Sequence, residues 1–264
     1  MRVLIFGLPG SGKTYLASRL KKYLGDHAEH FNADEVRAEA NDWDFSDAGR
    51  KRQSERMSKL VTDSVNNGKI AIADFIAPFR LSRQQFDADY KVWVDTCAKS
   101  EYANTDAIFE KPTIFGDSHE IDYRVQEKDF NKDAIRIAWQ LGERFLWNNQ
   151  APTTQMLGRY QPWHEGHQAL FDRAMAKHGQ VHLMIRDMET DDNNPYTANQ
   201  VKENLQKELR YYAGKVKIEI VPNLVNITYG RGVGYTFEEE VFDKTVHEIS
   251  ATKIRKKLRE EGKL

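Results

Sequence analysis

The chain has 264 residues, a formal charge of -1 at pH 7 and 40% hydrophobic residues, a balance that suits one large or two ordinary globular domains. The near-neutral charge gives no reason to expect nucleic-acid binding, and no apolar run approaches the roughly 20 residues that a membrane span needs. Because Cys97 is the single cysteine, an internal disulfide and a cysteine zinc cluster are excluded. We therefore expect a reducing, cytoplasmic location without a signal peptide.

The first predicted element is an apolar strand at residues 2–6. It leads into the loop Gly7-Leu8-Pro9-Gly10-Ser11-Gly12-Lys13-Thr14 and then into a helical pattern. Strand, glycine loop, Lys-Thr and helix is the order typical of the phosphate-binding loop of nucleotide triphosphatases and kinases. Glycines let backbone N–H groups converge on phosphate oxygens at the positive end of the helix. The residues expected to bind ATP are Gly7, Gly10, Ser11, Gly12, Lys13 and Thr14, with Lys13 on the β- and γ-phosphates and Thr14 holding Mg²⁺.

A second strand is predicted to end at Asn32, where a helix starts with Asp34 near its N-cap. A carboxylate at the carboxyl end of a parallel strand faces the ligand crevice of an α/β sheet. Asp34 can therefore accept the proton of a substrate hydroxyl or help to hold Mg²⁺ through water. The alternative is that Asp34 only caps the helix.

Further elements alternate in the same way. A long helix is predicted over residues 46–66, with a charged face of the kind that is usually solvated, and buried strands are predicted over residues 68–75 and 91–96. Strands that alternate with helices predict an α/β fold with a doubly wound parallel sheet.

Residues 1–112 resemble adenylylsulfate (APS) kinase, a P-loop kinase. The motifs that carry the resemblance are Gly7–Thr14, Asp34-Glu35-Val36-Arg37, Arg50 with Gln53 and Arg56, Phe75-Ile76-Ala77-Pro78-Phe79-Arg80, and Val94-Asp95-Thr96. The resemblance implies that Asp34 is the catalytic base. It also implies that Arg37, Arg50 and Arg80, with Gln53 where the family usually has Asn, bind an anionic nucleotide-like substrate. Guanidinium groups suit this task through their planar, forked donors.

One segment departs from the family. After the Val-Asp-Thr strand the family usually has Arg-Asp-Pro-Lys-Gly-Leu-Tyr, which helps to form a lid. Here the nearest stretch is Ala103-Asn104-Thr105-Asp106-Ala107-Ile108-Phe109, which lacks both the arginine and the lysine. The resemblance therefore implies phosphoryl transfer from ATP and leaves the acceptor open.

An amphipathic helix is predicted over residues 129–147, packed on the first sheet. The polar stretch 148–152 follows and ends in proline, so we place the domain boundary there. The predicted domains are residues 1–150 and residues 151–264.

The second domain opens with the loop Gly158-Arg159-Tyr160-Gln161-Pro162-Trp163-His164-Glu165-Gly166-His167, between a strand and a helix. His164 and His167 at a helix start can bind nucleotide phosphates and stabilise a leaving pyrophosphate. They could also bind a metal, but the sequence offers no convincing third ligand. Near the C-terminus, Ile249-Ser250-Ala251-Thr252-Lys253-Ile254-Arg255 predicts a helix capped by Ser250, which is either a second phosphate contact or an ordinary basic helix.

Together these motifs resemble the nucleotidyltransferase superfamily with His-x-Gly-His and Ile-Ser-x-Thr-x-x-Arg motifs. The likeness covers about residues 154–258. Residues 158–164 and Asn194-Pro195-Tyr196-Thr197 look most like the nicotinamide-nucleotide adenylyltransferase branch. The resemblance implies a smaller Rossmann-like domain in which a substrate phosphate attacks the α-phosphorus of ATP, or of CTP as in cytidylyltransferases, with Mg²⁺ assisting. It places the triphosphate on Gly158, Arg159, His164, His167, Ser250, Thr252 and Arg255.

We therefore predict a bifunctional transferase, in which a kinase phosphorylates a small molecule and a nucleotidyltransferase joins that phosphate to a nucleotide. One alternative is a compact sulfate-activating enzyme that makes phosphoadenylylsulfate, although the Gln-x-Arg-Asn-Pro-x-His motif of sulfurylases is not in register here. Another is a nucleotide-binding regulator without turnover. The expected partners are nucleotides and small molecules, not nucleic acid or membrane, and a homo-oligomer is compatible with the sequence.

Overall fold

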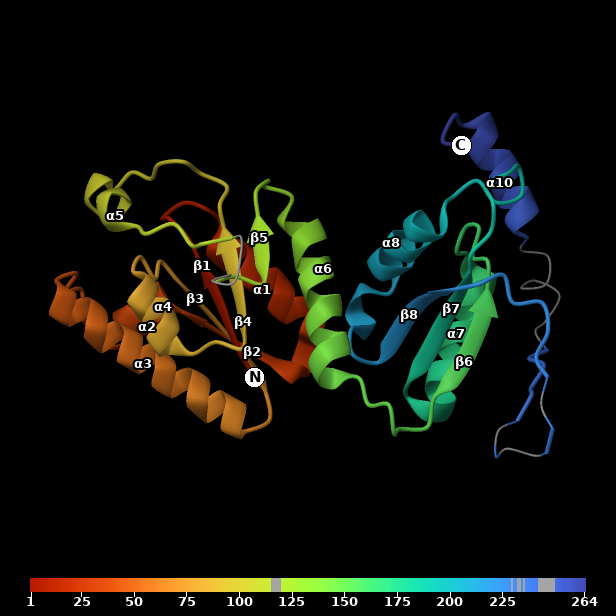
Figure 1. The fold of residues 1–264 in the computed structure, drawn as a ribbon, viewed down its shortest axis with the longest axis horizontal. Helices are drawn as coiled ribbons and strands as arrows, with labels where there is room; N and C mark the ends of the chain where they lie inside the picture. The colour runs from red at the N-terminus through yellow and green to blue at the C-terminus, as the bar shows by residue number, and fades with distance from the viewer. Residues whose placement is uncertain (115–119, 229, 232–233, 235, 242–249) are drawn as a thin grey trace. The chain divides into compact units, whose positions relative to one another are not determined.

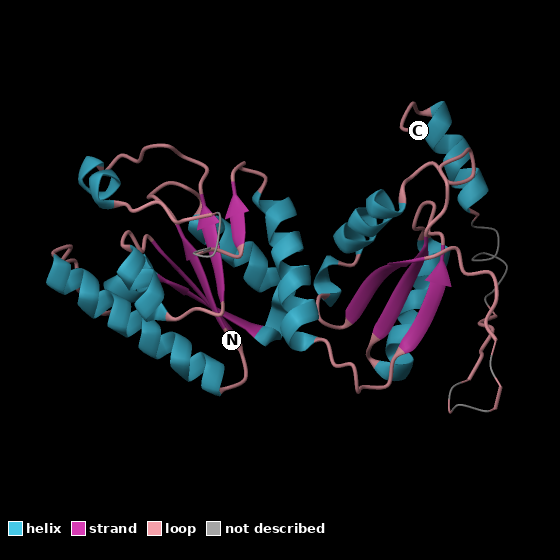
Figure 2. Cartoon of the chain, in the orientation of Figure 1, coloured by secondary structure: helices cyan, strands magenta, loops and turns pink. Residues whose placement is uncertain are grey.

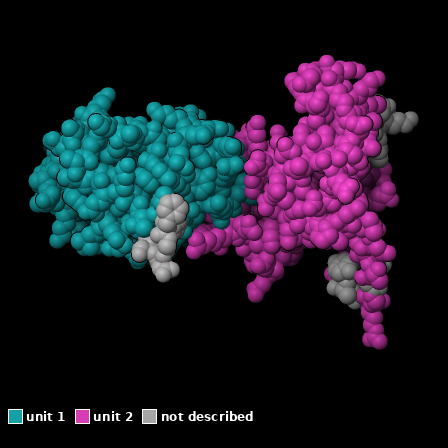
Figure 3. All heavy atoms as spheres, turned by 45° about the horizontal axis from the view of Figure 1, so that its top comes forward, with its two compact units in different colours: residues 1–140 teal, residues 141–264 magenta. Residues whose placement is uncertain are grey.

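The computed structural model describes residues 1–264 except 115–119, 229, 232–233, 235 and 242–249. The chain forms two compact units, Met1–Gln140 and Leu141–Leu264 (Figure 3). Residues 141–150, which we expected in the first domain, therefore lie in the second unit. The reason is close packing within that unit, because a Cβ on Gly142 would lie only 2.4 Å from the backbone nitrogen of Gly214.

Unit 1 is built on a five-stranded sheet of order β2-β3-β1-β4-β5, in which every neighbouring pair is parallel. Its strands are β1 (Arg2–Phe6), β2 (Ala28–Asn32), β3 (Ile70–Phe75), β4 (Tyr90–Val94) and β5 (Tyr123–Val125). Its helices are α1 (Lys13–Leu24), the 3₁₀ turn η1 (Gly25–His27), α2 (Ala33–Glu39), α3 (Asp47–Asn66), α4 (Arg80–Phe86), α5 (Ala103–Ile108) and α6 (Phe130–Leu141). The predicted parallel α/β sheet is confirmed for this unit.

Helices cover both faces of this sheet. α3 and α4 lie on one side of the strands, and α1 and α6 lie on the other (Figure 1). Right-handed crossovers between parallel strands produce this arrangement. The central strand β1 is accordingly buried on both faces, and Val3, Leu4, Ile5 and Phe6 are all 0% exposed. A strand that is apolar at every position is the pattern that a doubly covered parallel sheet requires.

Two capping residues fix where helices start in unit 1. The Ser46 side chain accepts a hydrogen bond from the Gly49 backbone N–H and starts α3 close to its predicted position. The cap of α2 is Asn32, whose side chain accepts hydrogen bonds from the backbone N–H groups of Asp34 and Glu35. The prediction that Asp34 lies near the N-cap is therefore confirmed, because Asp34 lies in the first turn of α2. The alternative, that Asp34 itself caps the helix, is wrong, because the Asn32 side chain bonds the two successive N–H groups.

Unit 2 contains a three-stranded parallel sheet of order β6-β7-β8 among the residues that the structure describes. Its strands are β6 (Thr154–Gly158), β7 (Val181–Arg186) and β8 (Val216–Val221). Its helices are the π-helical turn η2 (Gly142–Leu146), α7 (Glu165–His178), α8 (Ala198–Glu208), the 3₁₀ turn η3 (Arg210–Tyr212) and α10 (Ala251–Glu260). Figure 2 shows the strands of each unit in magenta, with the helices around them in cyan.

The strand and the helix predicted on either side of the loop at the start of the second domain are observed as β6 and α7. Alternate residues of β7, namely Val181, Leu183 and Ile185, are 0% exposed. α7 contacts β6 and β7, while α8 contacts β7 and β8. The helix expected over residues 129–147 ends as an α-helix at Leu141 and continues as η2. Within the described part of the chain, no helix has the length and apolar character that crossing a membrane requires.

Candidate functional site

The phosphate-binding loop joins β1 to α1, and geometry requires glycine at two of its positions. Gly12 precedes α1 with φ 95°, and a Cβ there would lie 2.2 Å from the Phe130 ring. A Cβ on Gly7 would lie 2.4 Å from the carbonyl oxygen of Val94. The Lys13 Nζ donates to the carbonyl oxygen of Leu8 at 2.8 Å, and burial lowers the pKa of Lys13. The ammonium group is therefore held over the loop, where bound phosphates would meet it.

Thr14 lies in a hydrogen-bonded network at the carboxyl ends of β2 and β3. Its hydroxyl donates to Asp74 Oδ2 at 2.6 Å and accepts from Asn32 Nδ2 at 2.9 Å. Asp74 is only 1% exposed, and its Oδ1 lies 2.7 Å from His30 Nε2. Parallel register brings these groups together, because Asn32 pairs with Asp74 and His30 with Ile72 across the two strands. The carboxylate is thus fixed beside the hydroxyl that we expect to hold Mg²⁺.

The donor set around Thr14 suits a magnesium ion. A threonine hydroxyl and one carboxylate are hard oxygen ligands, and Mg²⁺ normally completes its octahedron with phosphate oxygens and water. Among the described residues there is no group of three His, Cys, Asp or Glu side chains that could hold a metal by itself. Thr14 and Asp74 would therefore hold an ion that also binds the phosphates of a nucleotide.

Asp74 and His30 are the site residues that sequence reasoning missed. Asp74 ends the apolar run of β3, next to the phosphate-binding loop on the neighbouring strand β1. An apolar strand that ends in aspartate is the usual partner of a phosphate-binding loop, so this signal was present in the sequence. His30 gave no comparable signal, because only the pairing of β2 with β3 brings it to Asp74.

A cleft of about 2130 Å³ opens beside the loop, and Asp34 lines it together with Lys13 and Thr14. The cleft extends past the aromatic side chains of Phe75, Phe79 and Tyr102 and along α3. Asp34 is exposed, whereas Asp74 is buried within its hydrogen-bonded network. The two carboxylates therefore differ in what they can do, since only Asp34 is open to an incoming hydroxyl.

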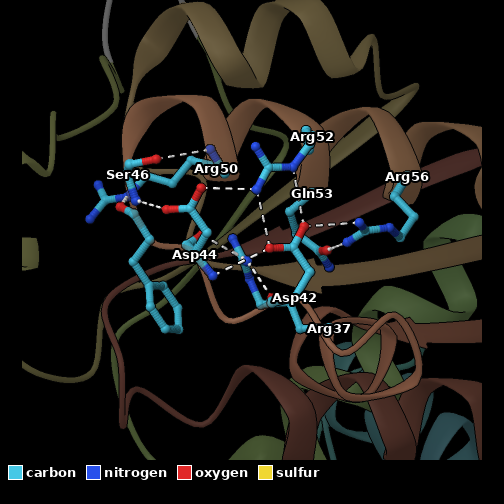
Figure 4. A network of polar contacts seen from close by, with 10 residues as sticks. Arg37, Asp42, Asp44, Ser46, Arg50, Arg52, Gln53 and Arg56 are labelled. Carbon is cyan, nitrogen blue, oxygen red and sulfur yellow. Dashed lines mark hydrogen bonds and ion pairs between the residues drawn. The ribbon is translucent and has the colours of Figure 1, made fainter.

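The arginines predicted to bind the acceptor are engaged with the protein itself. The Arg37 Nη1 donates to the carbonyl oxygens of Asp42 and Asp44 at 2.9 and 3.0 Å, and Arg37 is only 5% exposed. The Arg50 Nε donates to the Phe45 carbonyl oxygen at 2.9 Å (Figure 4). Both guanidinium groups thus hold the loop formed by residues 41–46, which we call the aromatic loop because it carries Trp43 and Phe45.

Two further charged side chains of α3 hold the same loop (Figure 4). Arg52 contacts the carboxylates of Asp42 and Asp44 at 3.3 and 2.9 Å, and Arg56 contacts Asp42 at 3.0 Å. These hydrogen bonds, led by the one from Arg52, hold the pKa of Asp42 well below its usual range. The buried Gln53 donates to the carbonyl oxygen of Ala33 at 2.9 Å, so its amide links α3 to α2.

Arg80 starts α4, and its Nε lies 3.1 Å from Glu120 Oε1 in a half-exposed ion pair. Arg80 is not among the described residues that line the cleft. The structure thus brings Arg37, Arg50 and Gln53 to the cleft and places Arg80 beside it.

In unit 2, His164 precedes α7 and His167 lies in its first turn. Their rings are stacked with centroids 3.8 Å apart, and His167 also contacts the rings of Tyr160 and Trp163. Both Nδ1 atoms are buried without a hydrogen-bond partner among the described residues. Burial lowers the pKa of His164, and burial together with the charge of His164 lowers the pKa of His167 to about 4. At neutral pH His167 is therefore uncharged.

Gln161 lies in the first sequence motif of unit 2, residues 158–167, and forms hydrogen bonds to residues of the other two, 194–197 and 250–255. Its side chain donates to the Tyr196 carbonyl oxygen at 2.7 Å and accepts from the Tyr196 backbone N–H at 3.1 Å. Its own carbonyl oxygen accepts from Arg255 Nη1 at 2.9 Å. Segments around residues 158–167, 194–197 and 250–255 therefore meet at one place, which the sequence alone did not show.

The remaining predicted residues lie around this meeting point. Arg255 is 5% exposed and also contacts the Thr252 hydroxyl at 3.2 Å, while Arg159 lies 3.4 Å from Asn194 Oδ1. The Ser250 side chain accepts from the Lys253 backbone N–H, which confirms the predicted cap of α10. Ile249, the first residue of this motif, is outside the described residues.

Burial lowers the pKa of Arg255, and the positive charges of Arg159 and Arg259 add to the effect. Such a concentration of positive charge suits an anionic ligand.

A family model matches within the first unit. Residues 1–100 match the family model of adenylylsulphate kinase. The bifunctional enzyme NodQ of Azospirillum brasilense is 35% identical over 100 residues, which cover 34% of this chain and 16% of that protein. An adenylyl-sulfate kinase of Emericella nidulans is 36% identical over 87 residues, 31% of this chain and 42% of that protein. The chain thus spans less than half the length of these curated relatives.

The sequence identity to solved structures is lower than that to the curated relatives. The Mycobacterium tuberculosis APS kinase CysC in complex with AMPPNP and APS is 22% identical, with a TM-score of 0.40, and the match covers 52% of this chain and 94% of that one. Shikimate kinase from Aquifex aeolicus is 16% identical, with a TM-score of 0.39, and the match covers 55% and 98% of the two chains. From the family match, the N-terminal region is a P-loop kinase domain similar to adenylylsulfate kinase.

Proposed function

We propose that the chain is a bifunctional transferase. Unit 1 transfers the γ-phosphoryl group of ATP to a small molecule, and unit 2 transfers a nucleotidyl group from a nucleoside triphosphate to a phosphorylated metabolite. The observation that carries the first activity is the Thr14–Asp74 network beside the phosphate-binding loop. The observation that supports the second is the convergence of its three motifs on Gln161.

In the kinase reaction, backbone N–H groups of the loop and the Lys13 ammonium would bind the phosphates of ATP. Thr14 and Asp74 would hold Mg²⁺, which supplies positive charge to the β- and γ-phosphate oxygens. Asp34, exposed in the cleft, would take the proton of the attacking hydroxyl. Positioning and charge neutralisation supply most of the catalysis in such reactions.

In the nucleotidyl transfer, His164, His167 and Arg255 would bind the triphosphate at the start of α7 and near the start of α10. The phosphate of the acceptor attacks the α-phosphorus, and the bond to the departing pyrophosphate breaks. The Nδ1 atoms of both histidines are buried without a partner among the described residues, so they offer hydrogen-bonding capacity to a ligand or to water.

A second candidate function is sulfate activation, because the family model that matches residues 1–100 is that of adenylylsulphate kinase. In that case unit 1 would phosphorylate adenylylsulfate, and unit 2 would make it from ATP and sulfate. We propose a cytoplasmic location for either function.

The test uses the full chain with γ-labelled ATP and a broad panel of metabolites, and measures ADP and pyrophosphate separately. Each metabolite is supplied both unphosphorylated and already phosphorylated. Both products should form from the unphosphorylated substrate. Asp34→Ala should remove ADP formation but keep pyrophosphate release from the phosphorylated substrate, and His167→Ala should remove pyrophosphate release alone. Neither product from any metabolite, with ATP still bound, would favour a regulatory protein. Phosphoadenylylsulfate from ATP and sulfate would establish the second candidate.

A further inference from the structure

The cleft beside Asp34 has an unexpected charge balance for a site that would hold two anionic nucleotides. Seven acidic and five basic residues line it among the residues that the structure describes. One of the basic residues, Lys13, belongs to the phosphate-binding loop and would serve ATP. Lys51 lies 4.0 Å from Glu55, one turn away on α3. The cleft therefore offers little positive charge to a second polyanion.

The arginines do not correct this balance. Arg37 lines the cleft, but it is 5% exposed and its guanidinium donates to two carbonyl oxygens of the aromatic loop. Arg80 pairs with Glu120 outside the described lining of the cleft. Residues 103–105 of α5 also line the cleft, in the segment where the sequence has neither arginine nor lysine. Of the five basic residues, Arg50 and Lys59 remain, and Arg50 gives one of its N–H groups to the Phe45 carbonyl.

What the cleft offers in place of charge is aromatic surface. Trp43 and Phe45 on the aromatic loop are 54% and 56% exposed, Tyr102 is 61% exposed, and all three line the cleft. Large aromatic side chains are usually buried, so exposed ones that share a single cleft suit the binding of a planar ring. Arg37, Arg50 and Arg52 hold the backbone and the acidic side chains of the aromatic loop, so the loop that carries Trp43 and Phe45 is organised before a ligand binds, which lowers the cost of binding.

We propose that the acceptor of unit 1 is a neutral or positively charged nucleoside, whose ring stacks on the aromatic loop and whose primary hydroxyl reaches Asp34. This inference rests on the proposed kinase function and narrows its acceptor. The hydroxyl gives its proton to the Asp34 carboxylate, and its oxygen forms a bond to the γ-phosphorus. The bond from that phosphorus to the bridging oxygen breaks, and ADP leaves with the electron pair. The product is a nucleoside monophosphate, which carries the kind of phosphate that a nucleotidyltransferase extends.

The experiment compares three acceptors at equal concentration on the full chain: nicotinamide riboside as a cation, adenosine as a neutral nucleoside, and adenylylsulfate as an anion. ADP formation should give a kcat/KM at least about tenfold higher for one of the two nucleosides than for adenylylsulfate, in line with the loss of a charge-assisted contact. A higher kcat/KM for adenylylsulfate overturns the inference and leaves the kinase function standing. ADP formation with none of the three, while ATP still binds, overturns the inference, and the kinase function falls with it only if the broad metabolite panel also yields no ADP.

The stacking surface is tested with Trp43→Ala and Phe45→Ala. Loss of a base–aromatic stack costs about 1–3 kcal/mol, so KM for the preferred nucleoside should rise about 5- to 150-fold, while KM for ATP changes less than about twofold. Trp43→Phe should restore most of the affinity. Tyr211→Ala, which removes an exposed aromatic ring in unit 2, is the matched control. An unchanged KM for the nucleoside in both alanine variants would show that the aromatic loop does not bind the acceptor.

Discussion

The polar groups of the two candidate phosphate sites are arranged differently. In unit 1, Thr14, Asn32, His30 and Asp74 bond to one another, and the Asp74 carboxylate is held through both of its oxygens. In unit 2, the His164 and His167 rings are stacked on one another, and both Nδ1 atoms are buried without a partner among the described residues. The first site is organised before any ligand arrives, whereas the second keeps hydrogen-bonding capacity that a ligand or a water molecule would use.

The difference affects how each site depends on protons. A buried network that is fully hydrogen-bonded is rigid, because each group fixes the orientation of the next. Two stacked imidazoles cannot both carry a charge at little cost, so protonation of one opposes protonation of the other. We therefore expect unit 1 to be sensitive to changes of single side chains and unit 2 to be sensitive to pH.

The largest effect is expected from Asp34→Ala. Removal of the proposed base should lower the rate of phosphoryl transfer by about 10²- to 10⁴-fold, because general-base catalysis contributes on that scale. The rate of ADP formation measures it, with the affinity for ATP as a check on folding. The matched control is Glu35→Ala, the exposed neighbouring carboxylate on α2. Equal activity of the two variants would remove Asp34 from the mechanism.

The corresponding change in unit 2 is His167→Ala. Loss of a donor that stabilises developing charge should lower the rate of pyrophosphate release by about 10²- to 10³-fold, with ADP formation unchanged. His178→Ala, at the other end of α7, serves as the control. If both variants release pyrophosphate at the wild-type rate, the stacked histidines have no role in catalysis.

The stability of unit 2 should fall in mild acid. The pKa of His167 is about 4 in the folded protein and about 6.5 when unfolded, so the unfolded chain takes up the proton first as the pH falls. Uncharged His167 therefore contributes roughly 3 kcal/mol to the free energy of unfolding. This contribution is present in full above pH 6.5 and is lost as the pH falls from 6.5 to 4. Urea unfolding of the wild type and of His167→Asn at pH 7 and pH 5 measures it. A wild type that loses no more stability than the variant between these two pH values would contradict the assignment.

A smaller effect is expected from His30→Leu in unit 1. The imidazole holds Asp74 Oδ1, and loss of a group that orients a metal ligand typically costs about 10- to 100-fold in metal affinity. The Mg²⁺ concentration that half-saturates ATP binding should therefore rise by about tenfold, measured by calorimetry without any acceptor. His30→Gln, which keeps a donor, should fall between the variant and the wild type. An unchanged magnesium dependence in His30→Leu would mean that Asp74 is held without its help.

Much of the fold was predictable from the sequence because its signals are local. Apolar runs placed β1 and β3, and Ser46 and Ser250 marked the starts of α3 and α10. The glycine pattern of the phosphate-binding loop was equally readable, since steric demands at Gly7 and Gly12 exclude any side chain. Short elements without such signals, such as α5 and β5, were not predicted.

The sequence alone was enough to identify the candidate residues of both sites, because a motif and its spacing depend only on the order of residues. Which of those residues are open to a ligand was decided by tertiary structure. Pairing of β2 with β3 brought His30 to Asp74, and hydrogen bonds to the aromatic loop engage Arg37, which was expected to bind the acceptor. Hydrogen bonds between residues distant in the chain gather Gln161, Tyr196 and Arg255 at one place. Such contacts depend on strand register and loop closure, which no local pattern encodes.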